Sequence, residues 1–408
     1  MAAVHGAGRR AIAKALVVAE VALSLVLLAG AGLLMRSVAQ FAAAPLTSQA
    51  GRLITMKISL PGKAYANDDR KIRFYTNLTD SLRALPDFRQ AVLSTGIPVW
   101  GGQGLNVLEV QGHSPPAPGA SPYDTGVMSV SMDYFAVAGP ALERGRPFDS
   151  RDREDSERVA IVNDALVAKY FLHENPLGRH IRVRDEKAAN PWLTVVGVVA
   201  NQKTATVYQE MAWVERPALY RPFRQEPSAH ANLLINTNQP AARVGAIVQR
   251  ETARLDPSVA VDDVQTMQHL LDRFILAYPR FRTALLGGFA AIALLLAAVG
   301  LYGVLAQLVS QRTQEIAVRI ALGARSSDVL AAIVKEGMLL VFAGLVLGLG
   351  GVWLLTRFLA ALLYGVRAMD PLILIGVCGV LTAASLLATY IPARRAASVD
   401  PMVALRYE

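Results

Sequence analysis

The sequence has little charge for its length and almost no cysteine. Of its 408 residues, 18% are charged and 53% are hydrophobic, whereas a soluble globular chain has about 25% charged residues. This composition excludes disorder over most of the chain, because disordered segments combine low hydrophobicity with high charge. The single cysteine, Cys378, excludes a disulfide framework and any metal site made of several cysteines.

Motifs of nucleotide, metal and nucleophile sites are missing as well. The chain contains no G-x-x-x-x-G-K-[ST] loop for phosphates, no H-E-x-x-H metal motif and no G-x-S-x-G elbow. The stretch 149–155 is rich in carboxylates, but it lacks the central glycine and the closing glutamate of a calcium loop, so it predicts a solvated charged loop. We therefore expect no cofactor, no metal and no enzymatic activity of the chain's own.

The missing charge is explained by four long apolar segments. Residues 15–35 contain one charged side chain, Glu20, and residues 284–309, 337–356 and 371–392 contain none. About 20 apolar residues form a helix that crosses the hydrocarbon core, and barrel strands are shorter and alternate in polarity. The sequence predicts four transmembrane helices, at 15–35, 281–309, 337–356 and 371–392. The first also resembles a signal peptide with its basic start, but it exceeds the 7–15 apolar residues of such signals, which favours a retained anchor.

Basic residues predict how the four helices are oriented. They are concentrated in the N-terminal segment 1–14, the loop 310–336 and the tail 393–408, while the loop 357–370 has few. The positive-inside rule therefore predicts that both termini and the loop 310–336 are cytoplasmic, in a multi-pass protein of a bacterial inner membrane surrounded by lipid. Much of the net charge of +9 then belongs to membrane flanks. The outer segment 36–280 has no basic stripe, so nucleic acid is not an expected partner.

Residues 36–280 alternate between strand and helix patterns. Apolar residues recur at helical spacing in the expected helix near 67–85. Strands are expected near 52–60, 92–97, 106–111, 127–130, 159–162, 193–199 and 232–236, and helices near 67–85, 164–171 and 241–255. The fold class is thus an α-helical membrane protein with four transmembrane helices and a large α+β extracytoplasmic domain of two subdomains, with residues from about 110 to 225 inserted in the first.

A regular apolar pattern precedes the second transmembrane helix. Val264, Met267, Leu271, Phe274 and Tyr278 follow one another at steps of three and four residues, which is the spacing of a coiled-coil seam. One hypothesis is a helical stalk that carries displacement between the membrane and the outer domain. An ordinary amphipathic helix packed on its own domain fits the same spacing equally well.

Two features within the apolar segments predict close or polar packing. Gly344 and Gly348 have the spacing at which helix backbones approach closely in lipid. Glu20 is costly in a membrane, but its position near one end of its segment is compatible with a polar partner or with contact to water.

The loop 310–336 predicts a helix, a tight turn and a second helix. Glu315 and Arg319 form a favourable i,i+4 pair, and Gly323 is suited to end the first helix. We expect Glu315, Arg319, Gly323, Ala324 and Arg325 to be a docking site for a soluble partner. The alternative is a helix pair that lies at the membrane surface.

Several of these segments resemble known families. Residues 312–324 resemble the signature of the FtsX-like permease domain, with Ala317 where glycine is more frequent, and residues 391–406 resemble that domain's end. Residues 130–135, 144–148 and 159–163 resemble the MacB-type periplasmic core domain.

The resemblance implies the permease subunit of a MacB-type ABC transporter for efflux or extrusion. It implies a cytoplasmic ABC-type ATPase on another chain, which would act through the loop that contains Glu315 and Arg319. It also implies a homodimer, or a pseudo-dimer with a second permease half. The alternative function is a non-transporting regulator or sensor whose outer domain binds a peptide, lipid or cell-wall partner.

Overall fold

The structure is a computed structural model of the chain. It describes residues 2–43, 49–88, 90–98, 103–112, 125–172, 174–184, 190–205, 213–311, 326–359, 363, 366 and 369–397. Two compact units are present: a helical unit of residues 1–40 and 277–408, and an outer unit of residues 41–276.

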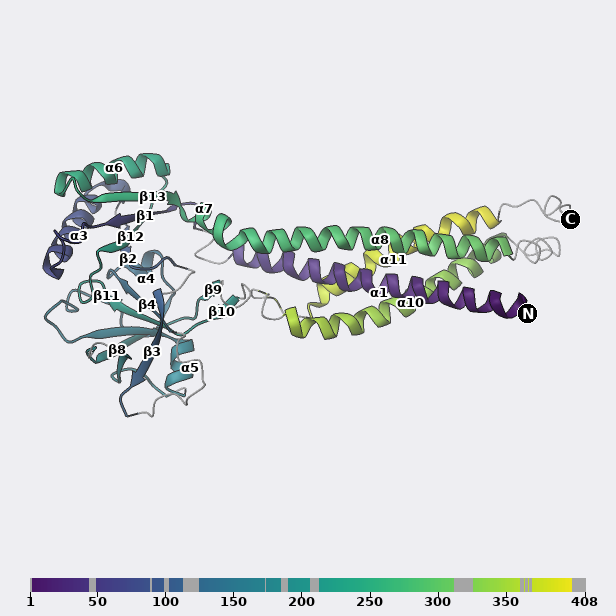
Figure 1. Ribbon diagram of the computed structural model, residues 1–408, viewed down its shortest axis with the longest axis horizontal. Helices are drawn as coiled ribbons and strands as arrows, with labels where there is room; N and C mark the ends of the chain where they lie inside the picture. The colour runs from purple at the N-terminus through teal and green to yellow at the C-terminus, as the bar shows by residue number, and fades with distance from the viewer. Residues whose placement is uncertain are drawn as a thin grey trace. The chain divides into compact units, whose positions relative to one another are not determined.

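The helical unit consists of long apolar helices (Figure 1). They are α1 (Ala2–Ala43), α8 (Ala277–Gln311), α10 (Ser326–Leu359) and α11 (Pro371–Ala397). Among the described residues, four helical stretches are long and apolar enough to cross a membrane: Ile12–Ala43, Met267–Gln307, Leu330–Leu355 and Pro371–Arg394. The four predicted transmembrane helices are confirmed, and each stretch overlaps one of the predicted segments.

The helices of this unit pack through small apolar cores. Val17 and Val21 of α1 are buried together with Leu301 of α8 and Val341 of α10. Large side chains such as Phe289 and Phe342 remain 52% and 65% exposed. Helices that are apolar on all sides suit a lipid environment, because hydrocarbon covers the faces that no neighbouring helix covers.

The outer unit has two hydrophobic cores, and the first belongs to what we call the α3–α6 lobe. Its strands follow the order β2-β12-β1-β13. The strands are β1 (Leu53–Ser59), β2 (Ala91–Ser94), β12 (His230–Asn236) and β13 (Ala260–Thr266), and the helices are α3 (Asp68–Arg83) and α6 (Ala241–Leu255). Asn67 caps α3 by accepting a hydrogen bond from the Asp69 amide. One face of α3, with Tyr75 and Leu78, is buried in the core.

The second core belongs to what we call the barrel lobe, because its strand pairings close a ring. The ring runs β11-β6-β8-β7-β3-β4, and β4 pairs with β11 again. The strands are β3 (Gln103–Val110), β4 (Thr125–Val130), β6 (Val159–Asn163), β7 (His180–Arg184), β8 (Leu193–Val199) and β11 (Ala218–Pro222). Helix α5 (Asp164–Tyr170) covers this core and is capped by Asn163, which accepts a hydrogen bond from the Leu166 amide.

Short elements complete the barrel lobe. Strand β5 (Leu142–Gly145) pairs with β8, and β9 (Lys203–Ala205) pairs with β10 (Trp213–Glu215) in a separate ribbon. Helix α4 (Tyr134–Val137) follows β4. In the α3–α6 lobe, a 3-10 turn at Pro86–Phe88 follows α3.

The two lobes are joined at one strand junction. β2 and β4 pair at Ser94 and Val130, and the Leu93 backbone exchanges hydrogen bonds with Ser131 next to this pair. The α3–α6 core contains residues from both ends of the outer unit, and the barrel core contains residues between Leu108 and Leu219. The two cores therefore agree with a predicted insertion of the second lobe in the first, although Phe223, within the predicted range 110–225, belongs to the first core.

Candidate functional site

The predicted coupling residues have no structural description. Glu315, Arg319, Gly323, Ala324 and Arg325 lie outside the described residues. The structure describes the helices on either side of them, α8 up to Gln311 and α10 from Ser326.

Gly344 and Gly348 lie where α10 meets α1. A Cβ atom on Gly344 would be 2.7 Å from Val21 Cβ and 3.0 Å from the Val18 carbonyl oxygen. A Cβ atom on Gly348 would be 2.8 Å from Leu25 Cδ2. Such distances are below normal contact, so this approach of the two helices requires glycine at both positions.

Two ion pairs connect α1 to other helices. The Lys14 ammonium lies 2.7 Å from a Glu336 carboxylate oxygen of α10, and the Arg36 guanidinium lies 2.5 Å from Asp370 at the start of α11. At 1.5 Å per residue, Lys14 and Arg36 are about 33 Å apart along α1. The hydrocarbon core is about 30 Å thick, so the two pairs lie at the right separation to mark its two boundaries.

Glu20 lies between these two ion pairs. It is about 9 Å further along α1 than Lys14. A Cβ on Gly300 of α8 would be 2.5 Å from Glu20 Oε2, and this oxygen is buried without a hydrogen-bond partner among the described residues. Of the two predicted explanations, a polar partner or contact to water, neither applies to this oxygen within the described residues, and it packs against Gly300 of α8 instead.

The predicted stalk seam differs from the structure at its start. Val264 lies in strand β13, and the helix begins at Met267, where the Thr266 hydroxyl accepts a hydrogen bond from the His269 amide. The seam therefore cannot extend through Val264 as a helix. The sequence signal for the start of the helix was the capping Thr266. The regular apolar spacing, which begins before it at Val264, led to a different prediction.

A π-helical turn changes which side of the segment is buried. Helix α7 (Met267–Leu271) is followed by the π-helix Asp272–Leu276, which leads into α8. Met267 and Leu271 are fully buried, but Phe274 is 48% and Tyr278 52% exposed. Because a π-turn holds one more residue than an α-turn, the buried position after Leu271 moves to Ile275. The five predicted seam residues thus do not share one buried face.

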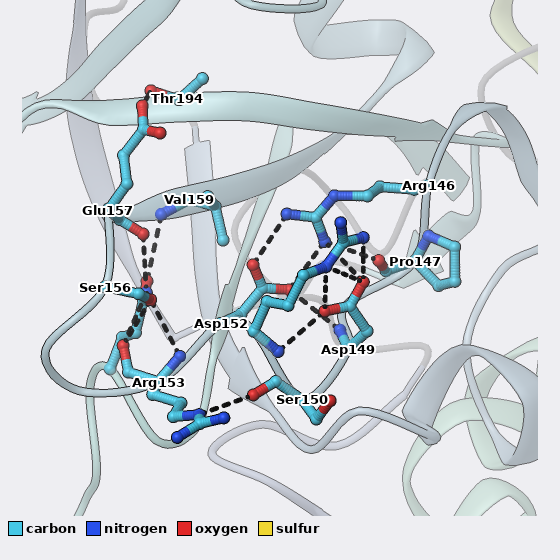
Figure 2. Close-up of polar contacts among 12 residues, drawn as sticks. Arg146, Pro147, Asp149, Ser150, Asp152, Arg153, Ser156, Glu157, Val159 and Thr194 are labelled. Atoms are coloured by element: carbon cyan, nitrogen blue, oxygen red, sulfur yellow. Dashed lines mark hydrogen bonds and ion pairs between the residues drawn. The ribbon is translucent and has the colours of Figure 1, made fainter.

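The charged loop after β5 is bonded within itself (Figure 2). The Arg146 guanidinium donates to both carboxylate oxygens of Asp152 at 2.8 Å, and the Asp149 amide donates to Asp152 at 2.9 Å. Hydrogen bonds from Arg151 hold the pKa of Asp149 well below its ordinary value. Arginines already occupy these carboxylates, so the loop stabilises its own conformation.

Sequence reasoning did not identify the two ion pairs. The four charged residues of these pairs lie at the edges of apolar segments: Lys14, Arg36, Glu336 and Asp370. Opposite charges at edges predicted to lie on the same side of the membrane were the signal that could have identified the pairs. The contact of Glu20 with Gly300 had no comparable signal, because neither spacing nor charge indicates which glycine a carboxyl group approaches.

Comparison with family models relates this architecture to known proteins. Residues 15–267, more than half of the chain, match the MacB-like periplasmic core domain. The chain belongs to this family. Residues 287–401 match the FtsX-like permease C-terminal domain. With the four apolar helices, these matches identify a MacB-like permease of the bacterial inner membrane.

Curated relatives support the same family. A macrolide export ATP-binding/permease protein MacB from Rhodospirillum rubrum is 29% identical over 310 residues, which is 70% of this chain and 44% of that protein. MacB from Acinetobacter baylyi is 27% identical over 292 residues, or 69% of this chain and 42% of that protein. The chain spans less than half the length of these relatives.

Two solved structures are similar to part of the chain. The periplasmic region of MacB from Actinobacillus actinomycetemcomitans has 15% identity and a TM-score of 0.34, and the match covers 54% of this chain and 91% of that one. The extracellular domain of the noncanonic ABC-type transporter YknZ from Gram-positive bacteria has 15% identity and a TM-score of 0.32, with 51% and 100% covered.

Proposed function

We propose that the chain is the permease subunit of a MacB-type ABC transporter that drives efflux or extrusion. The observation that carries this proposal is the order of its parts. A MacB-like periplasmic core domain lies between the first and second of four apolar helices, and the remaining helices match the FtsX-like permease domain.

The energy for transport would come from a cytoplasmic ABC-type ATPase. The chain has no phosphate-binding G-x-x-x-x-G-K-[ST] motif. The docking site we propose is the loop with Glu315, Arg319, Gly323, Ala324 and Arg325, on the same side as both termini. Its position between two transmembrane helices supports this role, because movement of the loop would move α8 and α10 directly.

A displacement of α8 would reach the outer unit along the chain. The helix is continuous from Met267 to Gln311 through the π-turn. Met267 and Leu271 are buried in the outer unit, so they would anchor this helix to the domain it moves. We therefore propose a stalk role for the segment Met267–Tyr278. Val264 belongs to the adjoining strand and not to this stalk. Such a permease would act as a homodimer, or as a pseudo-dimer with a second permease half.

The docking proposal is tested with purified full-length chain in lipid nanodiscs. Candidate ABC-type ATPases are captured on the immobilised chain, and their ATP hydrolysis is measured with and without it. Arg319→Glu and Gly323→Pro should each abolish capture and activation. Arg179→Glu, an exposed charge reversal in the outer unit, is the matched control and should retain both.

Two outcomes would contradict the proposal. Capture and activation that persist in both loop variants would reject the loop as the docking site. Activation of the ATPase without substrate movement in a proteoliposome assay would reject transport and favour a regulator that signals through the same loop.

A further inference from the structure

A pocket opens at the junction between the two lobes of the outer unit. Its volume is about 110 Å³. One face of α3 forms one wall, and the chain that leaves β4 and β11 forms the other. A molecule in this pocket would touch both lobes at the point where their strands meet.

The inner part of the pocket is apolar and already formed. Its floor contains Leu93 and Val130, which are buried, and the rings of Tyr75 and Phe223, which meet edge to face with centroids 5.1 Å apart. Met132 lies at the wall and is 38% exposed. An apolar cavity of about 150 Å³ binds benzene, and this pocket is smaller, so it is suited to an apolar body of at most about six carbon atoms.

Most of the charged side chains at the pocket are already paired. Arg83 donates to the Asp133 carboxylate at 2.8 Å and to the Ala91 carbonyl oxygen. Arg224 lies 3.3 Å from Glu154. Both carboxylate oxygens of Asp152 accept hydrogen bonds from Arg146, as Figure 2 shows.

Asp80 is different from these residues. This exposed residue lines the pocket, and its carboxylate has no ion pair or side-chain hydrogen bond within the described ranges. The preceding residue, Thr79, is buried, and its hydroxyl donates its proton to backbone carbonyl oxygens of α3, so its lone pairs remain available as acceptors. The unpaired carboxylate of Asp80 and the acceptor lone pairs of Thr79 therefore favour a cation that donates hydrogen bonds.

We propose that this pocket binds a compact amphipathic amine, with an apolar body of about six carbons on the floor and a protonated amino group at Asp80. Such a ligand is small, so the site is a regulatory or sensing site of the outer unit rather than a path for large cargo. Because it contacts both lobes, the bound molecule stabilises their junction. The proposal goes beyond the coupling function, and its test does not involve an ATPase.

The test uses three probes with the same apolar body on the full-length chain in nanodiscs. They are hexylamine, hexan-1-ol and hexanoate, which carry a positive, neutral and negative head. Binding is followed by the methyl NMR signals of Ile72 and Met132, which line the pocket, and of Ile181 and Met267, which do not. Hexylamine should shift only the first two signals and should saturate. Hexan-1-ol should bind about three- to tenfold more weakly, and hexanoate more weakly still.

Variants on α3 distinguish binding in the pocket from general partitioning of the probes into lipid. Asp80→Asn should weaken hexylamine by the same three- to tenfold factor and leave hexan-1-ol unchanged. Asp69→Asn removes a carboxylate from the same helix away from the pocket, and it should leave both affinities unchanged. Thr76→Trp should fill the pocket mouth and abolish saturable binding.

The proposal is overturned if hexylamine produces no saturable shift at Ile72 and Met132. It is equally overturned if hexanoate binds as tightly as hexylamine, or if Asp80→Asn leaves the hexylamine affinity unchanged. Asp80 is exposed on α3, so this variant should retain the methyl spectrum of the unliganded chain, and that spectrum verifies its fold.

Discussion

The approach of α1 to α10 makes a sharp prediction for glycine substitutions. Gly344→Ala would place a methyl group 2.7 Å from Val21 Cβ, where α1 has no room for it. Gly350→Ala is the matched control on the same helix, because no atom lies within 4 Å of the position its Cβ would take. Both variants change helix propensity equally, so their difference isolates the contact with α1.

The expected loss of unfolding free energy follows from how far the new contact falls short of a normal carbon–carbon distance. Carbon atoms in contact prefer a separation of about 3.5–4.0 Å, so the helices would have to separate by roughly 1 Å. Overpacking of this kind costs about 1–3 kcal/mol. We expect Gly344→Ala to reduce the free energy of unfolding by about 1–3 kcal/mol relative to Gly350→Ala.

The measurement is reversible unfolding in mixed micelles as the fraction of denaturing detergent rises. A double variant of Gly344→Ala with Val21→Ala should recover only part of the loss, because it removes Val21 Cγ1, which lies 2.8 Å from the new methyl group, but leaves Val21 Cβ at 2.7 Å. Equal unfolding free energies for Gly344→Ala and Gly350→Ala would refute the packing described here.

Three further predictions concern polar contacts. Asp370→Asn should lose the ion pair with Arg36, but its side chain should still accept a hydrogen bond from the Leu372 amide. It should therefore reduce the unfolding free energy in mixed micelles by less than Asp370→Ala does, with a difference of about 1 kcal/mol. Burial and the hydrogen bond to Asp256 raise the pKa of Tyr65 to about 12, so ultraviolet titration should show this tyrosine ionising well above pH 10, and Tyr65→Phe should lose about 1 kcal/mol. Hydrogen bonds from Ser258 and then Tyr65 lower the pKa of Asp256 below 3.8. Its stabilising contribution is therefore present above about pH 3.8 and lost as the pH falls toward the folded-state pKa, and acid unfolding of Tyr65→Phe should show a weaker pH dependence in this range.

Strong periodic patterns in the sequence were sufficient to predict the main elements. Helix α3 was predictable because Ile72, Tyr75 and Leu78 recur at helical spacing after a capping asparagine. Strand β6 was predictable as a run of buried residues, and its observed range, Val159–Asn163, agrees to within one residue. The four apolar helices follow from length and composition alone.

Elements whose signal is weak or tertiary could not be predicted. Strand β13 contains Asp262 and Asp263 and lies at the end of the strand order. None of its seven residues is buried, so it has no clear apolar pattern. Strand β7 was missed although Ile181 and Val183 alternate with polar residues, because it is short. The π-turn changes the helical phase by one residue, which no period of 3.5 or 3.6 residues can represent.

The lobe-junction pocket was not predictable because its walls come from distant parts of the chain. Asp80 and Met132 are far apart in sequence, and they line the same pocket because β2 pairs with β4. The same holds for Arg36 and Asp370, whose contact depends on how the helices pack.

The membrane topology is the central claim, and cysteine labelling tests it most directly. Cys378 is the only cysteine, so a Cys378→Ser background permits single cysteines to be introduced at Pro176 in the outer unit and at Ala324 in the loop. Cells with a permeabilised outer membrane are treated with a membrane-impermeant maleimide before and after the inner membrane is opened. The account predicts that Pro176→Cys reacts at once and that Ala324→Cys reacts only after opening. Labelling of both positions from the same side would contradict it.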